Sequence, residues 1–389
     1  MAALASVSAF AQSSVTLSGN LDVGYQAYDI KGNTFANSGG SNGSSTTAIL
    51  FTGTEDLGGG NAAVFQYEID PSLADTSSKT TGTSATGTTS NVTSSIGNGQ
   101  SFLGLNTAYG NIKFGAPNTA TLSASGDGNG GFSTAIGSGY RVTSFDAVRF
   151  QNSLRYDTPS FNGFSASYLA SAKNDKQNNT GNTGLTGNAQ NQTVGRDQVT
   201  EIALAYAQGP LTARAAQLKV EQWGRTDVTT AAAAAGGNVL YPTWTANTGK
   251  EFKLDTLSVK YDFANASVSA FSQKASSEVL AGTTAAKTTL QYDRKTTGVA
   301  GSYQVTPAIK LMANRATVTI GDETNVGTDG AKTTVTGLGV DYMLSKRTTA
   351  YFRTETDKDL AGVRSTTGYT AATGNTTYKA TAVGIRHTF

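Results

Sequence analysis

Hydrophobic and polar residues alternate one by one along much of the chain. The first apolar set falls on a single parity: Val15, Leu17, Leu21, Val23 and Tyr25. Asp22 and Gln26 take the other parity, and similar alternation recurs in 63–69, 103–109 and 149–156. A period of two is typical of a β-strand with one apolar and one polar face. The pattern therefore predicts an all-β protein whose strands show apolar residues to one side throughout.

Short and long connections alternate between the predicted strands. The short ones carry Gly, Pro, Asn or Ser, which suit chain reversal, and lie at 56–60, 108–111, 158–163, 208–210, 262–265, 305–307 and 344–347. The long ones are polar and lie at 31–45, 71–98, 117–148, 173–195, 224–249, 279–287, 322–331 and 359–375. Seven short and eight long connections predict sixteen antiparallel strands. An even strand number with connection lengths segregated by side is typical of a transmembrane β-barrel with short periplasmic turns and long external loops.

Composition agrees with such a barrel. Only 14% of the 389 residues are charged and 38% are hydrophobic, while 45 are glycine. No stretch approaches the ~20 consecutive apolar residues of a membrane helix, whereas a barrel strand shows lipid only every second residue. The net charge of +2, without a Lys/Arg cluster, gives no reason to expect nucleic acid as a partner.

The residues needed for most cofactor-free catalysis are missing. The chain has no cysteine and one histidine, His387, which excludes thiolate chemistry and multi-histidine metal sites. A barrel hydrolase would need a Ser–His pair with an orienting group, and the parity of His387 places it on the outward face. We therefore expect neither an enzyme nor a cofactor. An exported β-rich adhesin or binding protein without a pore is the alternative, but it does not predict the alternating connection lengths.

The first residues resemble an export signal. Ala9-Phe10-Ala11 has the small-x-small pattern that precedes signal-peptide cleavage. We expect residues 1–11 to be a signal peptide, although a positively charged start is missing, and 12–389 to form the barrel. A disordered Ala-rich start is the alternative.

Tyrosines stand at one offset from the short turns. They are Tyr109, Tyr206, Tyr261, Tyr303 and Tyr342. Amphipathic rings are favoured at a membrane–water interface. The repeated offset predicts an aromatic girdle on the periplasmic side.

Several segments resemble the general diffusion porins of Gram-negative outer membranes. They are Ser14–Leu17, Gly53–Gly60, Asn152–Pro159, Leu344–Thr348 and Val383–Phe389, in family order along the chain. The resemblance implies a sixteen-stranded barrel, a homotrimer, and a third long loop (117–148) folded inward to constrict the pore. It also implies lipid and lipopolysaccharide as surroundings. The terminal Phe389 resembles the signal that the barrel-assembly machinery reads.

A barrel of this size encloses an aqueous lumen. We therefore expect a channel for passive diffusion of ions and small hydrophilic solutes, selective by size and by fixed charge. Arg155 keeps the position of a family arginine, and alternation aims it inward. Two other family arginines are missing, because Thr47-Ala48 and Ala116-Pro117 replace them. We therefore expect only a modest anion preference.

The candidate selectivity residues come from the wall and from the third loop. On the wall they are Lys113, Arg149, Arg155 and Arg214, with Asp22 and Glu68 facing in on other strands. On the loop they are Asp127, Arg141 and Asp146, near the glycines at 126–131. These glycines do not indicate a nucleotide site, because no Lys-Ser/Thr ending follows them.

Overall fold

The computed structural model describes residues 14–30, 33–41, 47–71, 73, 99–134, 136–138, 149–171, 198–221, 248–283, 286–321, 330, 332–358 and 377–389. Within these ranges it is a single antiparallel sheet of seventeen strands with one helix. The first eight strands are β1 (Ser14–Ile30), β2 (Asn33–Ser41), β3 (Ala48–Gly58), β4 (Asn61–Ile69), β5 (Ser101–Thr107), β6 (Gly110–Ala116), β7 (Ser153–Asp157) and β8 (Phe164–Ser171). The remaining nine are β9 (Gln198–Gln208), β10 (Leu211–Glu221), β11 (Thr248–Asp262), β12 (Ala266–Thr283), β13 (Ala286–Thr306), β14 (Ile309–Ile320), β15 (Lys332–Met343), β16 (Thr348–Lys358) and β17 (Tyr378–Thr388).

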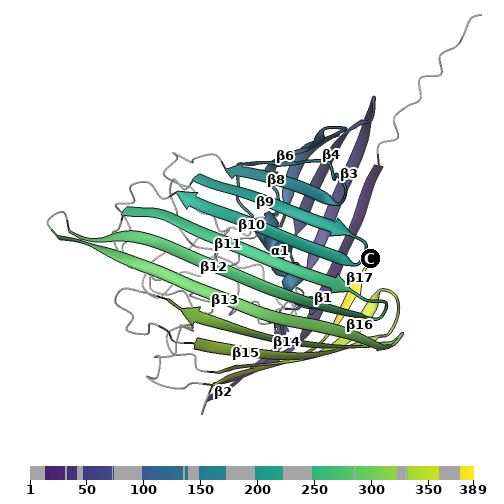
Figure 1. Ribbon diagram of the computed structural model, residues 1–389. Coiled ribbons are helices and arrows are strands. Elements are labelled where there is room, and N and C mark those ends of the chain that lie inside the picture. The colour runs from purple at the N-terminus through teal and green to yellow at the C-terminus, as the bar shows by residue number, and fades with distance from the viewer. Residues whose placement is uncertain are drawn as a thin grey trace, which may run out of the picture.

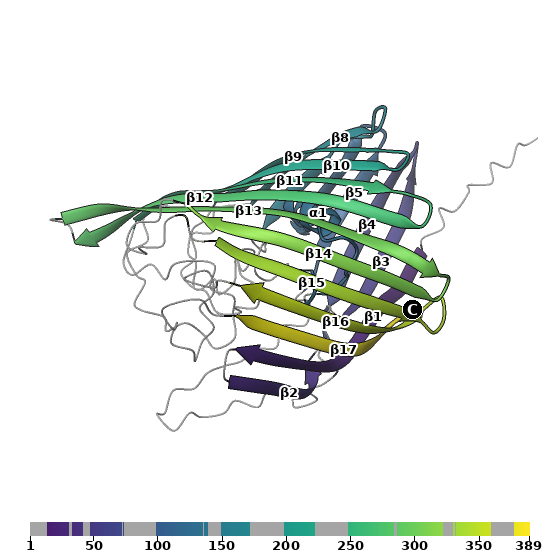
Figure 2. The same cartoon turned by 60° about the horizontal axis from the view of Figure 1, so that its bottom comes forward.

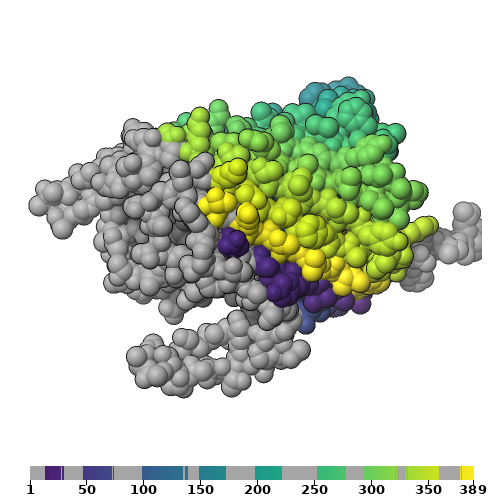
Figure 3. Space-filling view, turned by 90° about the horizontal axis from the view of Figure 1, so that it is seen from below, coloured from purple at the N-terminus to yellow at the C-terminus, as the bar shows by residue number. Residues whose placement is uncertain are grey.

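The sheet closes on itself, because the first and last strands pair. Asn20 opposes Thr388 and Ile30 opposes Tyr378 along the β1–β17 ladder. In Figure 3 the purple start of the chain and its yellow end lie side by side. The terminal residue adds two backbone bonds, since Phe389 N donates to Gly19 O at 3.0 Å and Gly19 N donates to Phe389 O at 3.1 Å. The result is a barrel without an open seam between these strands (Figures 1 and 2).

Seventeen strands occupy sixteen positions around the barrel. On the same side of β1, Ser14–Asn20 pairs with β3 and Gly24–Ile30 pairs with β2. Strands β2 and β3 therefore share one position, and β1 with β4–β17 supplies the other fifteen. The predicted sixteen-stranded antiparallel barrel is confirmed.

The predicted alternation sets the two faces of the wall. Val15, Leu17 and Tyr25 are exposed on the outside, while Asp22 and Gln26 are buried on the inside. One segment differs. Residues 149–156 were expected to form one strand with Phe150 facing out, but β7 begins at Ser153, and Phe150 is only 2% exposed.

The seven short connections lie where the sequence predicts them, but two predicted long loops contain strand. Within 31–45, β2 extends the wall beside β1. Within 279–287, β12 runs to Thr283 and β13 starts at Ala286, so the two strands are joined by a two-residue link. These strand ends project beyond the rest of the wall in Figure 2. Strand that extends past the lipid has no apolar face to maintain, so it loses the alternation by which strands were recognised.

The third long connection enters the barrel and contains the helix α1 (Ala120–Gly128). Figure 2 shows α1 inside the ring of strands. The prediction of an inward-folded loop over 117–148 holds for 117–134 and 136–138, but the helix within it was not predicted. No helix of the described residues is long and apolar enough to cross a bilayer.

Aromatic rings gather on the outer face near the short turns. Tyr109, Tyr261, Tyr303 and Tyr342 are all exposed there. Tyr206 packs against Phe164 with ring centroids 4.6 Å apart, and Tyr261 lies 4.8 Å from Phe263. Exposed rings at one level are what the predicted girdle requires.

Candidate pore constriction

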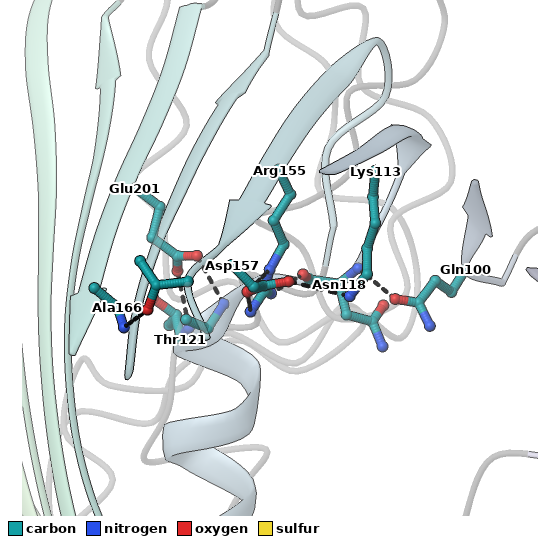
Figure 4. Close-up of polar contacts among 10 residues, drawn as sticks. Gln100, Lys113, Asn118, Thr121, Arg155, Asp157, Ala166 and Glu201 are labelled. Atoms are coloured by element: carbon teal, nitrogen blue, oxygen red, sulfur yellow. Dashed lines mark hydrogen bonds and ion pairs between the residues drawn. The ribbon is translucent and has the colours of Figure 1, made fainter. Parts of the chain in front are cut away.

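The start of α1 is fixed to the barrel wall by a carboxylate. Thr119 caps the helix, because its side chain accepts a hydrogen bond from Leu122 N at 3.1 Å. Glu201 on β9 accepts from the backbone amides of Ala120 and Thr121 at 2.7 and 2.8 Å (Figure 4). An anionic side chain at a helix N-terminus meets unpaired N–H groups and the positive end of the helix dipole. The helix therefore forms in a Gly- and Ser-rich segment because the wall stabilises its first turn.

The end of α1 and the following segment are fixed on other strands. Asp127 forms an ion pair with Arg214 on β10. Farther along, Arg353 on β16 donates to Thr134 Oγ1 at 2.9 Å and to Phe132 O at 3.2 Å.

Arg353 is itself almost fully buried. Its guanidinium pairs with Asp341 on β15 at 2.7 Å and lies over the ring of Phe132, 5.8 Å from the centroid. Next to it, Glu355 accepts from Gly137 N at 2.9 Å. The described part of the loop is thus attached to the wall at several points between Ala120 and Gly137.

A compact polar cluster lies where the chain enters this loop. Asp157 at the end of β7 pairs with Arg155 at 2.7 Å and with Lys113 on β6 at 3.1 Å. Arg155 also donates to the backbone carbonyl of Asn118, the residue that leads into α1. Figure 4 shows these side chains pointing toward one another beside the helix. They remain partly exposed, with 15% to 24% of each side chain accessible.

A second cluster of charged side chains lies close by, at the C-terminal end of β4. Arg149 donates to Asn118 Oδ1 at 3.2 Å and lies 3.6 Å from the carboxylate of Asp70. Glu68 accepts from Gln100 N at 3.1 Å. Burial and the neighbouring Glu68 raise the pKa of Asp70, which follows the last residue of β4, to about 7, although Arg149 opposes the shift. The Asp70 carboxyl therefore changes its charge near neutral pH.

Basic residues also face the lumen from the opposite wall. Lys310 on β14 lies within electrostatic range of Lys260 on β11 and Arg386 on β17, and of the Arg353–Asp341 pair. The loop comes near, since a Cβ added to Gly131 would lie 3.1 Å from Lys310 Nζ. These lysines and Arg386 are half-exposed. Positive charge therefore lies on both sides of the inserted loop.

The structure brings only some of the predicted residues together. Lys113 and Arg155 form one cluster, Arg149 lies beside it next to Glu68, and Arg214 and Asp127 pair across α1. Asp22 does point inward, but it is fully buried and accepts from Tyr351 Oη at 2.7 Å, so it does not line the water-filled space. Arg141 and Asp146 lie outside the described residues.

The residues that hold the loop, and several that set the charge of the lumen, were not among the site residues predicted from the sequence. They are Asp157, Glu201, Asp341, Arg353 and Glu355, with Lys260, Lys310 and Arg386 on the opposite wall. Alternation could have placed Asp157 beside Arg155, because residues two apart on a strand share a face. Among the described residues, no group of three or more His, Asp or Glu side chains could hold a metal ion.

Comparison with known structures gives the same fold. The anion-selective porin from Comamonas acidovorans is 23% identical over 97% of this chain and 100% of its own, with a TM-score of 0.65. OmpT of Vibrio cholerae, solved in a trimer form, is 15% identical over 97% and 99%, with a TM-score of 0.60. OmpF of Salmonella typhi, in a complex with daunomycin, is 16% identical over 96% and 97%, with a TM-score of 0.59.

Family membership rests on sequence as well. No curated protein matches the chain in a sequence search. The family model described as Gram-negative porin, however, matches residues 1–361. A closed barrel with a loop inserted in its lumen is the architecture of a channel, and together with this match it shows that the chain belongs to the Gram-negative porins of the outer membrane.

Proposed function

We propose that this porin is a diffusion channel with a weak preference for anions, set at the gap between the inserted loop and the wall. One observation carries the proposal: Asp157 shares its single negative charge between Arg155 and Lys113. Two positive charges and one negative charge leave this wall cluster with a net charge of one. The Arg214–Asp127 pair adds none, and the neighbouring group of Arg149, Asp70 and Glu68 offsets part of this positive charge when Asp70 is ionised.

The opposite wall supports the same sign. Lys310, Lys260 and Arg386 face the lumen near the loop, and Asp341 is already paired with Arg353. Lys260 has a local partner in Asp262 at 2.9 Å. A small positive excess on both sides favours anions without excluding cations, because selectivity in a wide aqueous pore follows the field of its charged rings.

The test is the zero-current potential across a planar bilayer under a salt gradient. Arg155→Ala should move this potential toward cations at low salt. The shift should fade at ~1 M salt, where the Debye length falls to ~3 Å. Arg347→Ala, on an exposed periplasmic turn, removes the same charge away from the loop and serves as the matched control. An unchanged potential for Arg155→Ala would show that Arg155 lies outside the selectivity region.

Assembly and export complete the proposal. The trimer form of the Vibrio cholerae neighbour supports a homotrimer here. We also propose cleavage after Ala11, recognition of Phe389 by the barrel-assembly machinery, and lipopolysaccharide as a neighbour in the outer leaflet. The channel carries small ions and hydrophilic solutes without a catalytic step. Amino-terminal sequencing of the mature protein should begin at Gln12, and retention of Phe10 would overturn the cleavage site.

A further inference from the structure

A half-buried phenylalanine ring lies on the lumen wall beside the cluster of Arg155, Asp157 and Lys113. Phe102 on β5 faces inward, because its neighbour Leu103 is 63% exposed on the lipid side. The ammonium nitrogen of Lys113 lies over the Phe102 ring, 5.4 Å from its centroid. A cation in this position is attracted by the negative face of the ring. The wall therefore presents an aromatic ring and a positive charge side by side.

Two glycines lie opposite this ring and this lysine. Gly115 on β6 is the register partner of Phe102, and Gly104 on β5 is the register partner of Lys113. Phe102 and Lys113 are therefore diagonal neighbours, a spacing that long and aromatic side chains bridge. A Cβ at Gly104 would lie 3.3 Å from Lys113 Cγ, and the φ of +133° at Gly115 would strain any other residue. Neither position places a side chain over the ring or against the lysine stem.

The hydrogen bonds of the cluster leave donor capacity on Lys113. The guanidinium of Arg155 is used on Asp157 and on the backbone carbonyl of Asn118. Lys113 has one oxygen partner among the described residues, Asp157 Oδ2 at 3.1 Å. An ammonium group carries three donors, and the Lys113 side chain is 24% exposed. Lys113 can therefore donate to an acceptor that arrives through the lumen.

An acidic side chain lies on the other side of the ring. Glu68 accepts from Gln100 N at 3.1 Å and from Gln66 Nε2 at 3.4 Å. Gln66 is the register partner of Phe102, and Gln100 precedes Phe102 by two residues. Along β5 the ring of Phe102 thus lies between the negative charge of Glu68 and the positive charge of Lys113. An anionic solute that contacts the ring is therefore oriented with its negative group toward Lys113.

We propose that Phe102 and Lys113 bind arene carboxylates, small anions in which a carboxylate is attached to an aromatic ring. The carboxylate accepts a charge-assisted hydrogen bond from Lys113 Nζ. The arene packs against Phe102 in an offset or edge-to-face arrangement, which aromatic pairs favour. Chloride can use only the charge, so the ring adds a preference among anions. The inference rests on the proposed diffusion channel and names a solute class for it, but it does not depend on the weak anion preference.

The experiment measures how benzoate, added to a potassium chloride solution, reduces the single-channel current of the folded protein in a planar bilayer. Benzoate should act at lower concentration than cyclohexanecarboxylate, which has the same charge and no aromatic ring, and than benzamide, which is neutral. Phe102→Leu should weaken the benzoate effect about fivefold, the typical contribution of an aromatic pair. Phe102→Tyr should retain the effect. Phe114→Leu, on the adjacent strand but 54% exposed on the lipid face, is the matched control and should behave as wild type.

Lys113→Gln tests the charge, and it should weaken the benzoate effect while leaving that of benzamide unchanged. Three outcomes would overturn the proposal: equal effects of benzoate and cyclohexanecarboxylate on wild type, an unchanged benzoate effect in Phe102→Leu, or benzamide as effective as benzoate. The selectivity proposal fails by a different result, an unchanged zero-current potential in Arg155→Ala. A benzoate effect that still depends on Phe102 would then leave this inference intact.

Discussion

Glu201 accepts a 2.7 Å hydrogen bond from the backbone amide of Ala120, which lies 81 residues earlier in the chain. The same carboxylate accepts from Thr121, so one wall residue orders the first turn of the helix inside the pore. Hydrogen bonds to a charged group contribute about 1.5–3 kcal/mol each. The position of the constriction therefore depends on a residue that does not itself line the open path.

Glu201→Gln should loosen the inserted loop. The amide keeps one acceptor oxygen and loses the charge that favours the helix N-terminus. We expect larger current fluctuations in single-channel recordings, with the barrel still folded. Glu55→Gln, at an exposed site near the β3–β4 turn, is the matched control. Quiet wild-type currents from Glu201→Gln would show that the other attachments hold the loop alone.

Asp157→Asn should strengthen the preference for anions. Asp157 is the shared partner of Arg155 and Lys113, so its neutralisation leaves both positive charges facing the lumen. The zero-current potential should move in the direction opposite to that of Arg155→Ala, and more at low salt than at high salt. A shift toward cations would mean that the two basic side chains turn away once their partner is lost.

Loss of Arg353 should destabilise the folded protein strongly. Arg353→Met leaves Asp341 with a buried charge and removes the bonds to Thr134 and Phe132, and breaking a buried pair typically costs about 3–5 kcal/mol. The double change Arg353→Met/Asp341→Leu removes both charges and should recover part of the loss. Heat-induced loss of the folded form on unboiled gels measures both variants. Equal stability of the single and double variants would argue against an energetic coupling of the pair.

The anion preference should increase as pH falls from 8 to 6. The pKa of Asp70 is raised to about 7, so acidification removes a negative charge beside Arg149. Because the folded protein holds this proton more tightly than the unfolded chain, Asp70 contributes its full stabilisation of the fold below pH 3.8, the ordinary pKa of the carboxyl. That contribution is lost as pH rises from 3.8 toward about 7. Reversal potentials at the two pH values measure the first effect. Asp70→Asn should remove the pH dependence, and its persistence would assign it to another group.

Removal of Phe389 should impair assembly of the barrel. The residue exchanges two backbone hydrogen bonds with Gly19, at the seam between the first and last strands. Deletion removes both bonds and the terminal ring, whereas Phe389→Ala removes the ring alone. Yield of folded protein in the outer membrane should fall for the deletion and less for the substitution. Normal yield of the deletion variant would contradict a role for this terminus.

Alternation predicted the wall because lipid on one side and water on the other impose a period of two. It did not predict the ends of β12 and β13 next to the link at 284–285, because a strand that extends beyond the lipid has water on both faces. It also missed α1, because this nine-residue segment is rich in Ala, Ser and Gly and its first turn is stabilised by Glu201 from a distant strand. Arg155 was found through its motif, while Asp157 in the same motif was overlooked. The net charge facing the lumen depends on such ion pairs. The parity of one residue predicts only which face its side chain is on, not its partner.

The β1–β17 ladder has a consequence for biosynthesis. Asn20 and Thr388 are 368 positions apart in the sequence, so the last ladder cannot form before the ribosome has made the final residues. Contacts of such separation form late and slowly. Until this ladder forms, β1 and β17 each present an unpaired edge that invites pairing with other chains. Closure of the barrel therefore distinguishes complete chains from truncated ones, because a chain that lacks β17 keeps an unpaired edge on β1.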